Sequence, residues 1–128
     1  MSNYGAEYIA YRLSRAHEAF RDAKLLAENQ AWNASINRLY YVCFYAASAL
    51  LLKKGINNKT HNRQLSQFNL HFIKTGIIPA EYGRLYARLM DWRQKGDYGD
   101  LFDSTKETVD LVLAPVEEFL NLVTGLVE

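Results

Sequence analysis

The 128-residue sequence has a single cysteine and no apolar run long enough to span a membrane, and each of these shortages excludes a class of protein. Cys43 has no second cysteine with which to form an internal disulfide. It lies in the apolar segment 39–52, which predicts a buried, unreactive thiol and a reducing compartment. This segment is shorter than the roughly 20 apolar residues that a membrane span needs. The N-terminal residues carry charges throughout, unlike a secretory signal, so we expect a cytoplasmic protein.

The chain also lacks an excess of charge and the residue clusters of metal and cofactor sites. A formal net charge of +1 gives no general attraction to nucleic acid or to membranes, so any binding of an anion must be local. His17, His61 and His71 have no metal-binding spacing, and no HExxH or CxxC pair occurs. The simplest place for His17 and His71 is a helix surface, and for His61 a solvated loop. The glycines of GDYGD lack the lysine of a P-loop, and we predict neither a metal nor a cofactor.

What the chain does have is helical periodicity over most of its length. Its share of hydrophobic residues, 49%, with 23% charged residues, is typical of one folded domain, here residues 1–128. Apolar residues recur every three or four positions, and no segment has the alternation of a β-strand. The predicted helices cover residues 7–28, 32–54 and 63–74, then a helix from just after Pro79 into 91–100, and a last helix from about 105. Short connections between them predict an all-α, five-helix up-and-down bundle.

Several residues predict where these helices end or bend. Gly55 is the expected stop of the second helix, and Ser104 with Glu107 has the spacing of a capping box at the start of the last one. Pro115 predicts a kink, because it lacks a backbone N–H and clashes with the preceding turn. The second helix is apolar on most sides, and its tyrosine-rich face exceeds what one small bundle can cover. This excess predicts a homodimer.

Polar residues gather around the second helix and the segment 91–100, DWRQKGDYGD, whose glycines we interpret as a turn that interrupts the bundle. They are Arg38 in the second helix, Lys59 and His61 after it, and Arg93, Asp97 and Tyr98 where the fourth helix ends. In one interpretation, Arg38 and Asp97 form an internal ion pair and Tyr98 covers a small core. In the other, Arg38, Arg93 and Lys59 line a cleft in which guanidinium groups bind phosphate.

Four segments, in this order, resemble HEPN-domain proteins of the small, single-domain bacterial type. They are NRLYYVCFYAASALLLKKGI, KTH, FIKTGIIP and RQKGDYGD, and the resemblance extends from about Tyr11 to about Leu122. It implies a helical up-and-down bundle that is commonly dimeric. It also implies frequent pairing with a minimal nucleotidyltransferase in a toxin–antitoxin system. Active members of the family are metal-independent ribonucleases whose signature is an arginine followed, after four to six residues, by a histidine.

The signature is altered in this chain. Arg93 matches the signature arginine, but Tyr98 stands after four intervening residues, and no histidine is within reach. Some relatives carry a regulatory tyrosine two positions beyond that histidine; here Asp100 stands there, so this regulation is not carried over. A phenol, with a pKa of about 10, is a poor base beside an imidazole at about 6.5. Tyr98 can still donate a hydrogen bond to a phosphate or stack on a base, so binding survives the change better than cleavage.

The leading prediction is therefore an HEPN-domain toxin or toxin partner that binds RNA or a nucleotide in a dimer cleft. The predicted binding residues are Arg38, Lys59, Arg93, Asp97 and Tyr98. A first alternative is a metal-independent endoribonuclease, with Arg93, Tyr98 and His61 as candidate catalytic residues and His61 supplying the proton transfer. A second alternative is a helical adaptor without catalytic activity, in which the polar segment only locks the fold.

Overall fold

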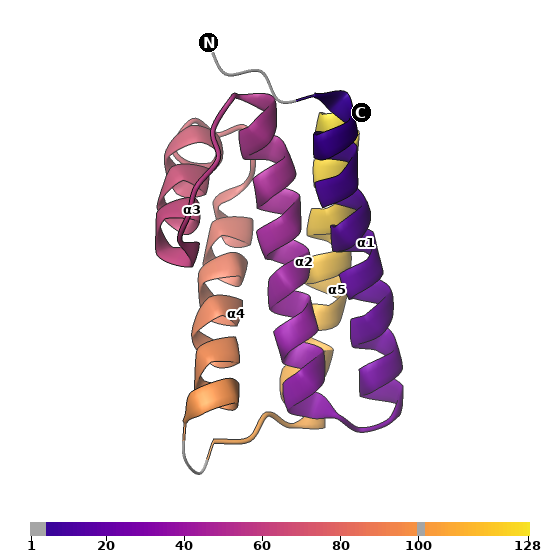
Figure 1. Ribbon diagram of the computed structural model, residues 1–128. Helices are drawn as coiled ribbons and strands as arrows, with labels where there is room; N and C mark the ends of the chain where they lie inside the picture. Colours follow the sequence, from indigo (N-terminus) through magenta and orange to yellow (C-terminus); the bar gives the residue numbers. More distant parts are fainter. Residues whose placement is uncertain (1–4, 100–101) are drawn as a thin grey trace.

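The computed structural model describes residues 5–99 and 102–128, and in these ranges the chain forms five α-helices and one π-helical turn, with no strand (Figure 1). The elements are α1 (Ala6–Glu28), α2 (Trp32–Lys53), α3 (His61–Phe68), η1 (Asn69–Ile73), α4 (Ala80–Tyr98) and α5 (Lys106–Val127). The predicted all-α class is confirmed, and the predicted third helix is divided between α3 and the π-helical turn η1.

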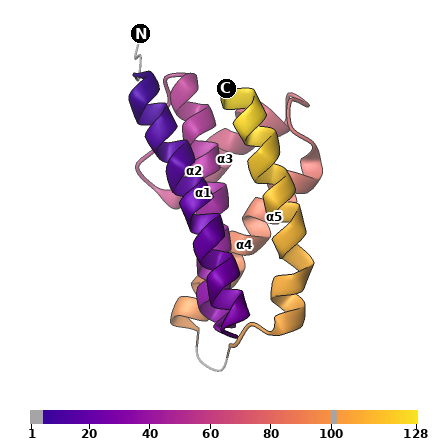
Figure 2. The same cartoon turned by 90° about the vertical axis from the view of Figure 1, so that its right-hand side faces the viewer.

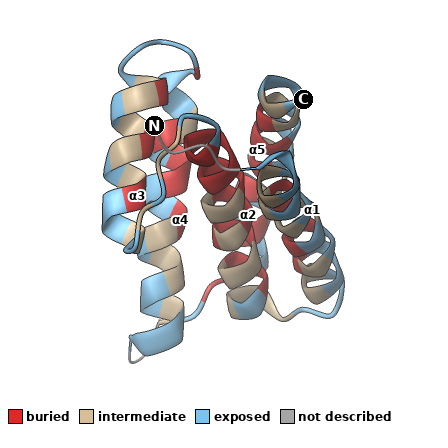
Figure 3. Ribbon diagram, turned by 45° about the horizontal axis from the view of Figure 1, so that its top comes forward, coloured by how far each residue is buried: buried red, intermediate tan, exposed pale blue. Residues whose placement is uncertain are grey.

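The central helix is α2, which packs against α1, α3, α4 and α5. Figure 1 places α1 and α4 on opposite sides of α2. Figure 2 shows that the start of α1 and the end of α5 lie at the same end of the bundle. Figure 3 shows buried positions along much of α2. Cys43 lies in this core with no exposed surface, and burial raises the pKa of its thiol, as expected for an unreactive cysteine.

The predicted interruption of the bundle at residues 91–100 is wrong for most of that segment, because α4 continues through it to Tyr98. Ion pairs one helical turn apart support this continuation: Lys95 Nζ lies 3.0 Å from Asp91 Oδ2, and Arg93 Nη1 lies 3.6 Å from Asp97 Oδ2. The helix ends at Gly99, where a Cβ atom would lie 2.7 Å from the carbonyl oxygen of Lys95. Arg93 and Asp97 therefore lie on one helical face and not on a turn.

The helix ends agree with the sequence at one site and differ at another. Gly55 has a φ of 80°, and the N–H of Ile56 donates to the carbonyl of Leu51 at 2.9 Å, which is the hydrogen bond of a glycine C-cap. At the start of α5 the predicted cap Ser104 is wrong. Thr105 is the N-cap, and its side chain accepts from the N–H of Thr108. The backbone N–H of Ser104 donates to Asn33 Oδ1 at 2.7 Å.

The start of α3 also differs from the prediction. His61 is the first residue of this helix and does not belong to the preceding loop. Thr60 precedes it in an extended conformation, and its hydroxyl accepts from the N–H of Arg63 at 3.1 Å, which satisfies one of the free donors at the helix start. Pro115 lies inside α5, as predicted, and the helix continues to Val127. Among residues 5–99 and 102–128, none of the helices combines the length and the apolar character that a membrane crossing requires.

Candidate functional site

The side chain of Arg93 projects from α4 onto the aromatic residues of α2. Its guanidinium carbon lies 4.9 Å from the centre of the Tyr40 ring and 6.0 Å from that of Tyr41. Only 14% of the side chain is exposed, and the ion pair with Asp97 is long, at 3.6 Å. The Nε atom of Arg93 is buried and has no hydrogen-bond partner among the described residues. Arg93 is thus held mainly by cation–π contacts and keeps unused hydrogen-bonding capacity.

His61 approaches the same tyrosine from α3. Its Nδ1 atom forms a hydrogen bond with the hydroxyl of Tyr40, and its ring stacks on Phe44 with 4.7 Å between the ring centres. Burial lowers the pKa of His61, and the positive charge of Arg93 lowers this pKa further. The interpretation of His61 as a solvated loop residue is therefore wrong: the side chain is half-buried, stacked and close enough to Arg93 to be affected by its charge.

The protonation of Tyr40 determines what His61 can donate. Burial raises the pKa of the Tyr40 hydroxyl, and the charge of Arg93 opposes this effect only in part, so the phenol keeps its proton at neutral pH. We assign the phenol as donor and Nδ1 of the neutral imidazole as acceptor of this hydrogen bond. The reason is that a phenol O–H is a stronger acid than the N–H of a neutral imidazole. The hydrogen of the imidazole then lies on Nε2. In this state His61 offers an N–H donor to an anion and is not arranged as a base.

Asn37 connects Arg38 to this cluster, and Arg38 forms no direct ion pair with Asp97. Arg38 Nε and Nη2 donate to Asn37 Oδ1 at 3.1 and 3.0 Å, and Asn37 Nδ2 donates to Asp97 Oδ2 at 3.1 Å. The Arg38 guanidinium lies 4.9 Å from the centre of the Tyr41 ring. The predicted pair between Arg38 and Asp97 is therefore wrong. Asp97 pairs with Arg93 on its own helix, and the amide of Asn37 takes the place of a carboxylate for Arg38.

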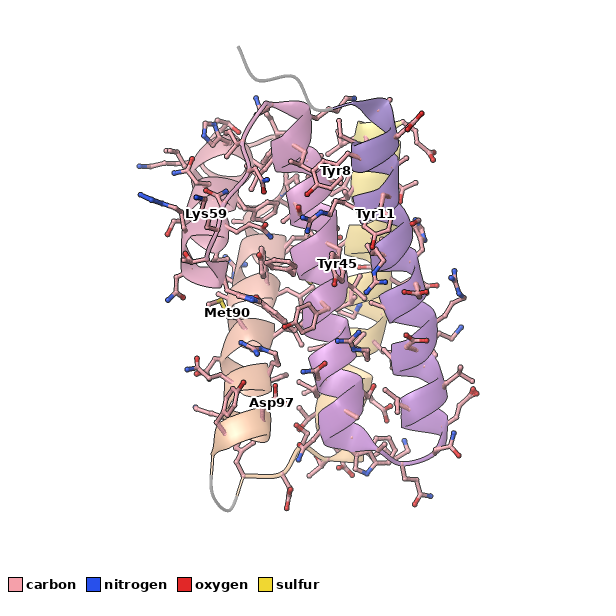
Figure 4. The ribbon with its side chains drawn as sticks, viewed as in Figure 1. Tyr8, Tyr11, Tyr45, Lys59, Met90 and Asp97 are labelled. Carbon is pink, nitrogen blue, oxygen red and sulfur yellow. The ribbon has the colours of Figure 1, made fainter. Side chains whose placement is uncertain are left out.

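Two of the residues predicted for the site lie apart from this cluster. Tyr98, the last residue of α4, is 77% exposed, so it does not cover a core. Lys59 lines an open polar basin of about 860 Å³ beside α3, and Figure 4 shows it on the α3 side of the molecule, well separated from Asp97. Asp100, which stands at the position of the regulatory tyrosine, lies outside the described residues. Residues 5–99 and 102–128 contain no group of three His, Cys, Asp or Glu side chains that could hold a metal ion.

Tyr40, Phe44 and Asn37 complete the cluster, and the sequence alone did not single them out. Tyr40 is fully buried, and it contacts both His61 and Arg93. A signal for it exists in the sequence: Tyr40 and Phe44 are one helical turn apart in a helix that is apolar on most sides, where a tyrosine hydroxyl needs a polar partner. His61 is that partner.

The bundle and this cluster define an all-α domain with an arginine and a histidine held on one buried tyrosine. The sequence model of the HEPN domain family matches residues 9–126, and the chain belongs to this family. The resemblance of the four sequence segments is thereby confirmed.

Its relatives come from bacteria and archaea. The chain is 40% identical over 126 residues to "UPF0332 protein" of Thermotoga maritima. This alignment covers 98% of this chain and 96% of the relative. Two proteins of Methanocaldococcus jannaschii, each named "Putative toxin", are 33% and 30% identical over 115 and 109 residues. These alignments cover 90% and 85% of this chain, and 85% and 74% of the relatives. HEPN membership and the names of these relatives indicate a toxin-like protein.

Proposed function

We propose that this HEPN-domain protein is the toxin-side component of a toxin–antitoxin system and binds RNA or a nucleotide through Arg93. The observation that carries the proposal is the state of the Arg93 side chain, which is 14% exposed and has a buried, unpaired Nε. A guanidinium stacked on Tyr40 loses little further freedom when it binds phosphate, and its N–H groups fit phosphate oxygens in pairs. His61 adds an N–H donor beside it.

The direct test is binding of fluorescently labelled RNA, measured by anisotropy, with Arg93→Ala and a matched control. Lys95→Ala is that control, because it removes the same charge from the same helix, where Lys95 is 55% exposed and paired with Asp91. Loss of charge-assisted hydrogen bonds predicts about tenfold weaker binding, or more, for Arg93→Ala. Lys95→Ala should change the affinity by about twofold at most. Equal losses in the two variants would reject a specific role for Arg93.

A ribonuclease is the second candidate, and it gains support from one observation: Arg93 and His61 lie against the same ring, that of Tyr40. For His61 to take a proton at Nε2, the imidazole hydrogen would first have to move to Nδ1, with the Tyr40 hydroxyl as its acceptor. Incubation of transfer RNA with the wild type and His61→Gln in the presence of a chelator tests this candidate. Cleavage that disappears in His61→Gln supports the enzyme, and intact RNA with the wild type rejects it.

The proposal includes two protein partners. A second copy would bring its own Arg93 to a shared cleft, and a minimal nucleotidyltransferase would act as the antitoxin. The tyrosine-rich face of α2 supports the homodimer less strongly than its sequence suggests, because Arg15 and Arg38 of the same chain cover Tyr45 and Tyr41. Sedimentation of the purified chain tests the homodimer. Co-purification with a nucleotidyltransferase encoded by a neighbouring gene, and suppression of toxicity by it, test the second partner.

A further inference from the structure

Arginine side chains lie on tyrosine rings along one face of α1 and α2. The guanidinium of Arg12 is 5.2 Å from the ring centre of Tyr8, and that of Arg15 is 5.5 Å from the ring centre of Tyr45. Tyr8, Arg12 and Arg15 follow one another at steps of four and three residues, so they share a face of α1. Tyr11 beside them is 54% exposed. We call Tyr8, Tyr11, Arg12, Arg15 and Tyr45 the arginine–tyrosine strip. Figure 4 shows its three labelled tyrosines on the face turned to the viewer.

The strip is continuous with the Arg93 cluster. Tyr41 lies between them: its ring centre is 5.8 Å from that of Tyr45 and 4.9 Å from that of Tyr40. Arg93 and Arg38 both stack on Tyr41, at 6.0 and 4.9 Å. An unbroken row of aromatic rings and guanidinium groups therefore leads from the proposed phosphate site on α4 across α2 to α1.

The cations of this face are poorly neutralised. Among residues 5–99 and 102–128, no ion pair within 4.0 Å is formed by Arg12 or Arg38. Arg15 has only an exposed pair with Glu18 at 3.5 Å, which contributes little. Arg12 donates to the Tyr8 hydroxyl at 2.8 Å, but its Nε is buried without a hydrogen-bond partner among the described residues. Such guanidinium groups retain N–H donors for an anion, and the tyrosines hold them in place.

The chemistry of the strip distinguishes among partners. A second copy docked on the strip by a two-fold axis would oppose it with the same arginines and tyrosines, which supply no anionic group for the guanidinium groups. A duplex offers phosphates but keeps its bases stacked inside. A single strand offers both phosphates and free base faces, and aromatic side chains beside cations are the surface that binds it. The strip contains both arginine and tyrosine side chains, so both parts of a single strand would be bound.

We propose that the arginine–tyrosine strip is a second contact site for single-stranded RNA, which extends from the Arg93 cluster over α2 onto α1. This inference rests on the proposed function, because it names the form of RNA that the protein prefers. Arg12 and Arg15 bind successive phosphates, and Tyr11 stacks on a base. The strip determines affinity and the preference for single strands.

The test compares labelled single-stranded RNA with a duplex of the same sequence, over a series of salt concentrations. The first variant is Arg12→Gln with Arg15→Gln. The matched control is Arg21→Gln with Lys24→Gln, two exposed cations that helical periodicity places away from the strip on α1. Removal of two phosphate contacts should weaken single-strand binding about tenfold or more and reduce the slope of log affinity against log salt by about 1.4. The control should change the affinity by about twofold at most.

A second variant separates stacking from charge. Tyr11→Ala removes no charge and, because the ring is 54% exposed, leaves the core intact. Loss of one stacked base predicts about fivefold weaker binding of the single strand, or more, with an unchanged salt slope. Duplex affinity should stay within about twofold. Circular dichroism and sedimentation of each variant exclude loss of folding or a change of assembly as the cause.

The outcomes separate this inference from the function on which it rests. If Arg93→Ala loses affinity but the strip variants bind single strands like the wild type, the strip is not a contact site, and the proposed function stands. If the wild type binds no RNA at all, both the proposed function and the inference about the strip are rejected. If the strip variants change the sedimentation of the protein together with its affinity, the strip is a contact between copies, and the inference is overturned.

Discussion

Two neighbouring tyrosines of the core, Tyr40 on α2 and Tyr86 on α4, have the same residue type and burial but different partners. Both side chains are fully buried, and their ring centres are 6.1 Å apart. Burial raises the pKa of each hydroxyl. The hydroxyl of Tyr86 accepts a hydrogen bond from Gln64 Nε2 at 3.0 Å, and the same nitrogen donates to the carbonyl of Phe44 at 2.8 Å. This neighbourhood is uncharged, and Gln64 is itself buried.

The partners of Tyr40 are of another kind. They are the titratable ring of His61 and the cation of Arg93, and both of these side chains are only partly buried. The two tyrosines therefore differ in what can respond to a ligand or to pH, although their burial is the same. A buried tyrosine alone indicates a packed core. A buried tyrosine whose partners carry charge and reach the surface indicates a site.

The largest expected effect is on stability, at Tyr86. Tyr86→Ala should lower the free energy of unfolding by about 3–5 kcal/mol, because it leaves a cavity beside Phe68 and removes the partner of Gln64. Arg93→Ala should lower it by only about 1 kcal/mol, the cost of a cation–π contact. Urea unfolding followed by circular dichroism measures both. Similar values for the two variants would mean that Arg93 is as structural as Tyr86, and the distinction between the two tyrosines would be lost.

Removal of the hydroxyl alone should distinguish the two tyrosines by their effect on RNA binding. Tyr40→Phe and Tyr86→Phe each remove one buried hydroxyl, and each should cost about 1 kcal/mol of stability. Only Tyr40→Phe releases His61 from its hydrogen bond, so only this variant should weaken the binding of single-stranded RNA, by about fivefold. Anisotropy titrations of the two variants, side by side, check this expectation. An equal loss of RNA affinity in Tyr86→Phe would contradict it.

The fold was predictable because periodicity and end signals are local. The apolar stripes predicted α1 and α2 within a few residues, and the stop expected at Gly55 follows the end of α2. The predicted third helix is divided between α3 and η1. The errors at the ends of α4 and α5 have different causes. At α5 the cap is Thr105, one residue after Ser104, and the backbone of Ser104 is bound to Asn33, a residue far away in the sequence. The glycines of residues 91–100 did not interrupt α4 because pairs such as Asp91 with Lys95 favour a helix up to Tyr98.

The site was less predictable, because its contacts depend on how three helices meet. The sequence indicated Arg93 and His61 as chemical groups, but their common partner Tyr40 looked like any other aromatic residue of an apolar helix. Arg38 needed a polar partner, as predicted, but an amide on the adjacent residue supplied it where a carboxylate was expected. Residue types thus predicted the need for partners. Only the packing of α2, α3 and α4 selects which partner is close.

The smallest expected effect is a pH dependence of the stability, which arises from His61 beside Tyr40. The pKa of His61 is lowered in the folded state by burial and by Arg93, so the unfolded chain binds a proton at a higher pH than the folded one. The contribution of His61 to stability is therefore complete above about pH 6.5, the ordinary histidine value, and is lost as the pH falls through this window toward the lowered pKa. His61 faces Tyr40, Tyr41 and Phe44 of α2, and Arg93 of α4.

Urea unfolding at pH 7.5 and 5.5 measures this dependence, with Arg93→Gln as the informative variant. Removal of the guanidinium charge leaves only burial to lower the pKa of His61, so the loss of stability at acid pH should be smaller in Arg93→Gln than in the wild type. Titration of the His61 ring by NMR should give a pKa that rises in the same variant. Tyr86→Phe changes no charged group near the imidazole and should retain the wild-type dependence. A dependence unchanged in Arg93→Gln would mean that the cation does not act on His61, and that the two groups do not form one site.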